Sequence, residues 1–121
     1  MKLVCLALGA VLSLSAPALA LAACTAPTAP AAVDGAQATM AQLASAKDGV
    51  VAFMGASDSY QECLIAEVAA QKKAAKAKRT KLDPAIQKAA DDAINANQAD
   101  KEKVGADFNA AVKAYKAAHP S

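Results

Sequence analysis

Two pairs of aromatic residues constrain the fold of this chain more than any other feature of its sequence. Phe53 and Tyr60 are seven residues apart, as are Phe108 and Tyr115, and the chain has no other Phe, Tyr or Trp. Seven residues correspond to two turns of an α-helix, so each pair lies on one face of a helix. The spacing therefore predicts two amphipathic helices, each with an aromatic pair on its buried face.

The two predicted helices are separated by a break at residues 80–84. There Asp83 is a suitable N-cap, and Pro84 is suited to the first helical position because its missing N–H is not needed. Thr39 is an equally suitable N-cap for the first helix. We expect a hairpin domain over residues 39–119, with one helix over about 39–79 and the other over about 84–118.

Folding the hairpin about a midpoint near residue 82 predicts that the two aromatic pairs meet. Phe53 then lies opposite residues 108–111, and Tyr60 lies opposite Val104. The middle of the second helix carries Asn97, Gln98 and Lys101, which interrupt its apolar stripe and predict loose packing beside Cys63. Gly49 and Gly55 each cost about 1 kcal/mol in a helix interior, so the sequence leaves open whether the first helix is continuous.

Residues 1–22 have the pattern of a secretory signal peptide. Lys2 is the lone charge before an apolar run over residues 3–14, and Ala-x-Ala cleavage sites follow at residues 18–22. Their removal leaves about 99 residues, enough for one small domain and without a transmembrane segment. We expect export, most simply to a bacterial periplasm, where disulfides persist.

Two cysteines remain after removal of the signal peptide. Cys24 and Cys63 form an even pair in an oxidising compartment, which favours a disulfide. Residues 21–24, Leu-Ala-Ala-Cys, also fit the lipobox of bacterial lipoproteins, in which Cys24 is acylated. These two fates exclude each other, because the lipid occupies the Cys24 thiol. The sequence favours the disulfide and keeps lipidation at Cys24 as the alternative.

Residues 23–38 predict an extended arm that ends in a turn. Pro27 and Pro30 favour a polyproline-like conformation, and Asp34-Gly35 is a turn signal. Such an arm spans roughly 30 Å from Cys24 to the turn at about 3.1 Å per residue. A helix from Thr39 to Cys63 spans about 36 Å at 1.5 Å per residue, so an arm that runs back along it arrives near Cys63.

Residues 71–81 contain six basic residues and no acidic residue. The simpler interpretation is a solvated helix end, where cations suit the helix dipole. The alternative is contact with an anionic envelope surface, such as lipid phosphate. Nucleic acid is not expected, since export removes that target and no aromatic residues are interleaved with the charges. The six residues, which we call the basic segment, are Lys72, Lys73, Lys76, Lys78, Arg79 and Lys81.

The sequence offers little that could carry catalysis. The single histidine, His119, stands in the C-terminal tail, and no pair of residues has metal-ligand spacing. No serine has a nucleophile motif, and the acidic pairs on the helices have no pocket predicted around them. We therefore expect no enzyme activity, no cofactor and no metal site.

The order of these features resembles a group of small exported proteins of unknown function from Gram-negative bacteria. The resemblance rests on a pattern that can be written CxxPxxP, DG, YxxCL and FNxxVxxYK, which here begins at Cys24 and ends at Lys116. Paired cysteines recur in that group, so the resemblance implies a Cys24–Cys63 disulfide. It implies no activity.

Taken together, the sequence predicts an all-α fold: a long antiparallel two-helix hairpin with an extended Pro-rich arm. About 30% of the residues are Ala, so the hydrophobic fraction of 55% overstates the size of the core. The expected function is a non-catalytic periplasmic structural or interaction module that contacts another envelope protein or itself. The alternatives are an outer-membrane lipoprotein acting as a helical spacer and a binder of anionic envelope surfaces through the basic segment.

Overall fold

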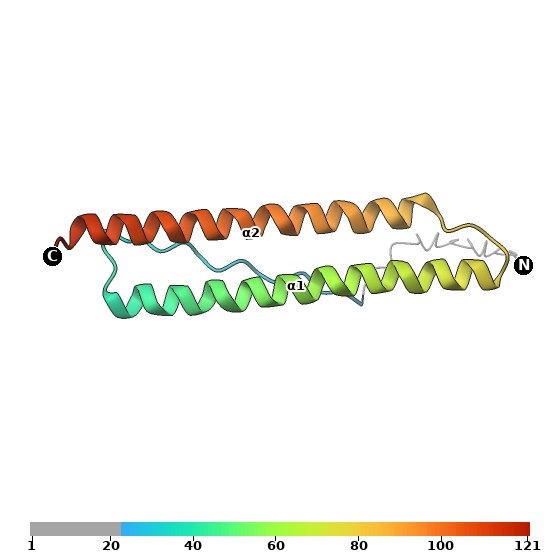
Figure 1. Cartoon of the computed structure of the whole chain (residues 1–121), viewed down its shortest axis with the longest axis horizontal. Helices are drawn as coiled ribbons and strands as arrows, with labels where there is room; N and C mark the ends of the chain where they lie inside the picture. Colours follow the sequence, from blue (N-terminus) through green and yellow to red (C-terminus); the bar gives the residue numbers. More distant parts are fainter. Residues whose placement is uncertain (1–22) are drawn as a thin grey trace, which may run out of the picture.

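The structure is a computed structural model that describes residues 23–121, so the predicted signal peptide lies outside the described residues. It contains two helices, α1 (Met40–Ala77) and α2 (Pro84–Ala118), which run antiparallel (Figure 1). Residues 23–39 are non-helical and run as an arm along the hairpin. The predicted all-α hairpin with an extended N-terminal arm is confirmed.

Both predicted N-caps are confirmed. The Gln42 N–H donates to Thr39 Oγ1 (3.1 Å), and the Thr39 N–H donates to Gln42 Oε1 (2.8 Å), so α1 begins with a capping box. Asp83 caps α2 by accepting from the Ala85 N–H (2.9 Å), and Pro84 follows at the first helical position. These bonds satisfy N–H groups that a helix start otherwise leaves without a partner.

α1 is continuous for 38 residues and passes through both glycines. A Cβ at Gly55 would have no neighbour within 4 Å, and one at Gly49 would touch only the Pro30 Cβ at 3.8 Å. Close approach of the arm or of α2 therefore does not explain Gly55. The helix tolerates it because α1 is stabilised by packing along its whole length rather than by propensity alone.

The end of α1 is set by a Schellman motif around Arg79. The Thr80 N–H donates to the Ala75 carbonyl (2.9 Å), and the Arg79 N–H donates to the Lys76 carbonyl (3.0 Å). Arg79 adopts φ 56°, the left-handed conformation in which glycine is usually found. The chain reverses at this residue, three positions before the predicted midpoint.

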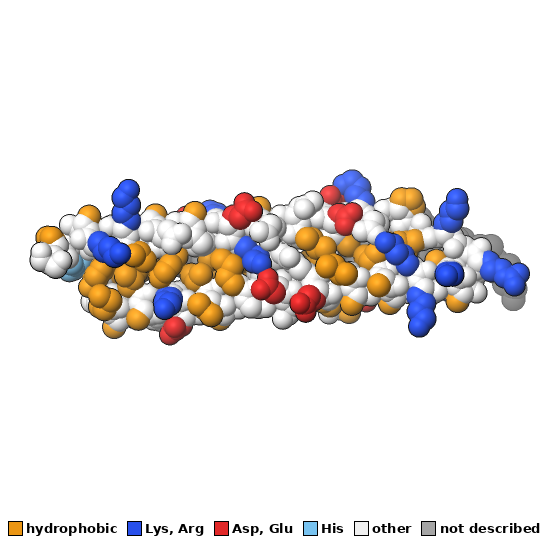
Figure 2. Space-filling view, viewed as in Figure 1, with side chains coloured by type: hydrophobic (Ala, Val, Ile, Leu, Met, Phe, Trp, Pro, Cys, Tyr) orange, Lys and Arg blue, Asp and Glu red, His pale blue; other side chains and the backbone are white. Residues whose placement is uncertain are grey.

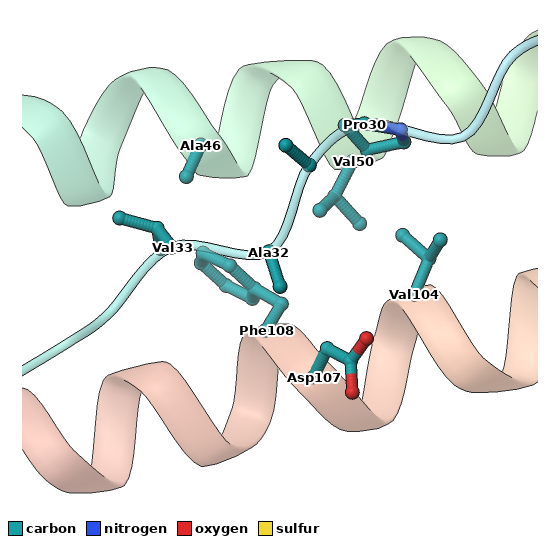
Figure 3. Close-up of a pocket in the computed structure, with 9 residues that line it drawn as sticks. Pro30, Ala32, Val33, Ala46, Val50, Val104, Asp107 and Phe108 are labelled. Atoms are coloured by element: carbon teal, nitrogen blue, oxygen red, sulfur yellow. The ribbon is translucent and has the colours of Figure 1, made fainter.

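The early reversal changes the register between the helices. Phe108 lies across from Ala46 and Val50 rather than from Phe53, and Val104 lies beside Val50 rather than Tyr60 (Figure 3). The predicted register is thus wrong by more than one helical turn. The error arises because the prediction took residue 82 as the apex, whereas the backbone already runs back from Arg79.

The core between the helices is narrow. Its larger buried side chains are few, and alanines complete it, as the composition predicts. Each helix contributes one stripe that faces the other helix. The buried apolar side chains on the helices are Leu43, Phe53, Leu64, Val68, Ala90, Val104 and Ala111.

Candidate functional site

The arm is fixed to α1 by a disulfide. Cys24 and Cys63, 39 residues apart in sequence, are joined with a Cα–Cα distance of 5.7 Å. Cys63 lies near the middle of α1, so the bond anchors the start of the arm halfway along the hairpin. A sulfur in this bond cannot also form the thioether of an acylated lipoprotein. Between the two fates that the sequence left open for Cys24, the structure contains the disulfide.

The far end of the arm is fixed to α2 by a close backbone contact. Asp34 forms a turn, accepting from the Ala36 N–H through its carboxylate (3.0 Å) and from the Ala38 N–H through its carbonyl (2.9 Å). A Cβ at Gly35 would lie 1.8 Å from the carbonyl oxygen of Ala111. Only glycine therefore fits at this point, and the Asp34-Gly35 turn is a docking element as well as a change of direction.

Between these two anchors the arm fills the groove of the hairpin. Pro30 and Val33 of the arm pack among Val50, Val104 and Phe108 (Figure 3). The cavity that remains is about 20 Å³, which is room for about one water molecule. This part of the groove is a filled core and has no space for a small-molecule ligand.

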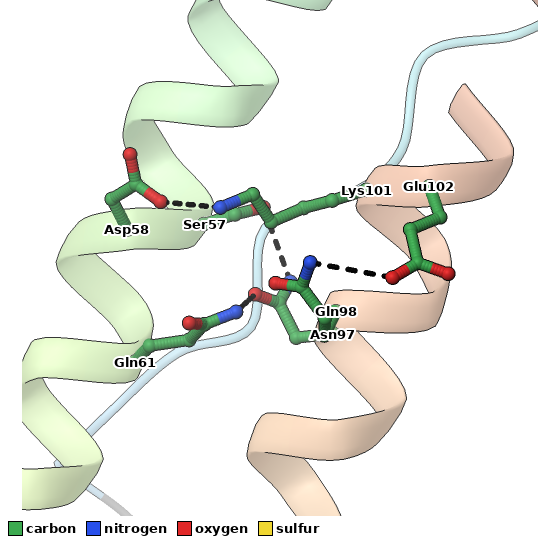
Figure 4. Close-up of polar contacts among 7 residues, drawn as sticks. All are labelled: Ser57, Asp58, Gln61, Asn97, Gln98, Lys101 and Glu102. Carbon is green, nitrogen blue, oxygen red and sulfur yellow. Dashed lines mark hydrogen bonds and ion pairs between the residues drawn. The ribbon is translucent and has the colours of Figure 1, made fainter. Parts of the chain in front are cut away.

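A buried polar cluster joins the helices at mid-length. Ser57 is fully buried and Asn97 is 4% exposed. The Asn97 side-chain amide donates to Ser57 Oγ (3.1 Å), and Gln61 Nε2 donates to Asn97 Oδ1 (2.8 Å; Figure 4). We call Ser57, Gln61 and Asn97 the polar layer. Within the described chain no buried side-chain nitrogen or oxygen lacks a hydrogen-bond partner.

An ion pair lies beside the polar layer. Lys101 of α2 reaches across the groove to Asp58 of α1, and the Lys101 side chain is only 19% exposed (Figure 4). Gln98, by contrast, is exposed and bonds Glu102 of its own helix (3.5 Å). The expectation of loose packing here is wrong, because Asn97 and Lys101 are engaged and Gln98 does not face α1. Pairing a buried amide with a buried hydroxyl fixes which residues of the helices face each other.

The spacing of residues on α2 indicated that Asn97 is buried, although its polar side chain predicted exposure. Asn97 continues the seven-residue series of buried α2 positions formed by Ala90, Val104 and Ala111, so its position indicated burial. Its partner could not be identified without the register, since Ser57 is 40 residues away.

The basic segment gathers at the closed end of the hairpin (Figure 2). All six side chains are exposed, and none takes part in the ion pairs found among residues 23–121. The nearby acids on the helices are fewer, so this end is positively charged at neutral pH.

A second hollow lies between the helices in the half nearer the closed end, beyond the reach of the arm. It measures about 190 Å³ and is open to solvent. Ile65 on its rim is 60% exposed, whereas Val68 and Ala90 at its base are buried. Figure 2 shows apolar side chains in both halves of the groove, separated by charged side chains at mid-length. This half of the hairpin therefore presents apolar surface to solvent.

The remaining chemistry of the described chain is sparse. His119 stacks on Tyr115, with ring centroids 4.3 Å apart, and closes the end of α2. Residues 23–121 bring together no group of three or more His, Cys, Asp or Glu side chains able to hold a metal ion. Nor does any helix in this range have the length and apolar character needed to cross a membrane.

Comparison with protein-family models, with curated proteins and with solved structures found no match to this chain. The resemblance to small exported proteins stays a prediction, and function must be argued from the geometry of the chain itself.

Proposed function

We propose that this protein is a non-catalytic structural or interaction module of the bacterial periplasm. The observation that carries the proposal is the arm, which is held by Cys24–Cys63 at one end and by Gly35 on Ala111 at the other. The arm packs into one half of the groove. The cavity that remains between Pro30, Val50 and Phe108 is about 20 Å³, which is too small for a ligand. The chain thus uses its disulfide and its buried polar groups to hold a rod in one shape.

A fixed rod is suited to presenting a surface. A long hairpin offers two kinds of exposed feature for recognition, namely the apolar hollow around Ile65 and the basic segment at the closed end. Exposed apolar surface rimmed by charge is typical of interaction sites rather than of catalytic ones. The partner in this proposal is another envelope protein or a second copy of the chain.

Localisation is supported by two independent features of the chain. A secretory pattern precedes the described residues, and a disulfide that closes 39 residues is stable in an oxidising compartment. An outer-membrane lipoprotein would require a free Cys24 at the moment of acylation and would leave Cys63 without its partner. The disulfide favours the unanchored periplasmic module over that alternative.

Intact-mass measurement of the protein purified from its native envelope tests the localisation and the covalent state. We expect a chain that begins near Ala23, lies two daltons below the dithiol mass, and gains two alkyl groups only after reduction. A chain that begins at Cys24 and carries diacylglycerol and a fatty acid would overturn the proposal in favour of the lipoprotein.

Site-specific photocrosslinking in living cells tests the interaction itself. A photoreactive residue at Ile65, on the rim of the hollow, should give a discrete crosslinked product. The same residue at Ala70, which is exposed on another side of α1, is the matched control and should give none. Absence of a product from Ile65, with none from Ala70, would count against an interaction module.

A further inference from the structure

One exposed face of α1 carries acids at one end, apolar residues in the middle and bases at the other end. Its positions follow steps of four, three, four, three and four residues, which keeps them in one stripe along the helix. All of them are exposed. The residues of this acid-to-base stripe are Asp58, Glu62, Ile65, Ala69, Lys72 and Lys76.

The acid-to-base stripe is complementary to itself when a second copy is turned end for end. The spacing of the stripe is the same in both directions. A two-fold axis perpendicular to α1 at the level of residue 67 therefore places the stripe of a second, antiparallel copy against the first. Glu62 then faces Lys72 of the second copy, and Asp58, which also pairs with Lys101 of its own chain, faces Lys76. A parallel arrangement in the same register would instead place like charges together, which is destabilising.

The middle of the stripe supplies the apolar contact. Ile65 and Ala69 face each other across the axis, and the hollow of about 190 Å³ lies beside them, with Val68 and Ile94 in its lining. An Ile65 side chain from a second copy fits such a recess as a knob fits a hole. The exposed 60% of Ile65 is then covered in both copies.

The arm leaves this face free. Ile65 follows Cys63 by two residues, which places it about 200° further round the helix, on roughly the opposite side from the disulfide. On α2 the residues at the same level are Gln87, Asp91, Ile94, Gln98 and Lys101, the last of which pairs with Asp58 of the stripe. A second copy therefore meets amides, one carboxylate, an isoleucine and one lysine that is already paired with Asp58. Figure 2 shows this face, with acids at mid-length and bases toward the closed end.

We infer that the acid-to-base stripe is the interface of an antiparallel homodimer. The two copies overlap through the halves nearer their closed ends and form a longer rod, with the two disulfide-anchored arms toward its outer ends. This inference deepens the proposed function, on which it rests for its biological setting, by naming the partner as a second copy of this chain. Exposed ion pairs are individually weak, so the charges select the register while the apolar centre supplies most of the attraction.

Paired charge reversals test this geometry. The protein is produced from the full sequence, purified in its oxidised form, and examined by sedimentation equilibrium over a wide range of concentrations. Glu62→Lys places two bases opposite each other at both ends of the interface, and Lys72→Glu places two acids there. Each variant alone should raise the dimer dissociation constant at least about tenfold, as should high salt to a smaller degree.

Mixing the two variants gives the decisive readout. In a heterodimer of Glu62→Lys with Lys72→Glu every facing pair is again of opposite charge, so the equimolar mixture should dimerise about as well as the unaltered protein. Asp48→Lys and Lys113→Glu make the same charge changes at exposed positions outside the overlap and should leave dimerisation unchanged. Circular dichroism of each variant verifies the helical content.

Three results would overturn the inference. One is a protein that stays monomeric at all concentrations. Another is a mixture that remains monomeric although both variants are folded. The third is a monomer that binds vesicles of anionic phospholipid through Lys72 and Lys76, which would identify the bases as a membrane contact. Failure of the dimer would leave the Ile65 photocrosslinking result to decide the proposed function separately.

Discussion

The side-chain amide of Asn97 on α2 donates a hydrogen bond to the hydroxyl of Ser57 on α1, 40 residues earlier in the chain. Both side chains are buried, and Gln61 satisfies the remaining oxygen of Asn97. An apolar stripe of alanines can slide by a turn without losing much contact, because its side chains are small and alike. The polar layer removes that freedom, since any other register leaves a buried amide or hydroxyl without a partner.

Removing both sides of the polar layer should cost less than the sum of removing each side alone. Asn97→Leu leaves the buried Ser57 hydroxyl without a partner and should lower the free energy of unfolding by about 1–3 kcal/mol. In the double variant Ser57→Ala with Asn97→Leu no unpaired hydroxyl remains, so its loss should be smaller than the sum of the two single losses. Urea unfolding of the four proteins measures the coupling. Strict additivity would show that the hydrogen bond does not couple the helices.

Two glycine-to-alanine substitutions should have opposite effects on stability. A Cβ at Gly35 would collide with the Ala111 carbonyl, so Gly35→Ala should displace the turn and lower the free energy of unfolding by about 2 kcal/mol or more. A Cβ at Gly55 would have no neighbour within 4 Å, so Gly55→Ala should raise the free energy of unfolding by up to about 1 kcal/mol through helix propensity. Thermal unfolding of both variants provides the comparison. Equal effects would show that the arm turn does not dock on α2.

The disulfide should stabilise the arm far more than the helices. Closing a loop over a separation of 39 residues contributes at most about 3–4 kcal/mol in the chain-entropy account. Replacing Cys24 and Cys63 together by Ala should therefore lower the midpoint of unfolding markedly. Before unfolding, the variant should keep most of the helical circular dichroism signal, because the arm is not helical. Limited proteolysis should cut within residues 25–33 only in the variant. Protection of that segment in both proteins would show that docking at Gly35 suffices.

Sequence reasoning recovered the elements of this fold better than their relation to each other. Thr39 and Asp83 are caps whose chemistry is local, so they were readable from a few neighbouring residues. The register depends on where the chain reverses, and that point is Arg79, a residue without the glycine signature of a left-handed turn. Because the predicted apex lies three residues too late, the partner of Asn97 does not follow from the sequence.

The candidate interaction face shows the same division between local and non-local information. The basic residues Lys72 and Lys76 were evident as charges, and Ile65 as an apolar residue, from the sequence alone. That they share a free face depends on which side of α1 the arm occupies, and this follows from the Cys24–Cys63 bond in three dimensions. The sequence therefore shows which residue types could form the site, whereas the hollow beside Ile65 is visible only in the structure.

The left-handed residue at the hairpin apex predicts a stabilising substitution. Arg79 has φ 56°, a conformation that costs a residue with a Cβ roughly 1–2 kcal/mol and costs glycine almost nothing. Arg79→Gly should therefore raise the free energy of unfolding by about 0.5–1 kcal/mol, the rest of the gain being offset by the greater freedom of glycine in the unfolded chain. Lys78→Gly is the matched control, since Lys78 has φ −85° and the substitution relieves no strain. Urea unfolding should separate the two variants, with the control no more stable than the unaltered protein. A gain shared by both would point to charge removal at the closed end, rather than backbone relief at Arg79, as the cause.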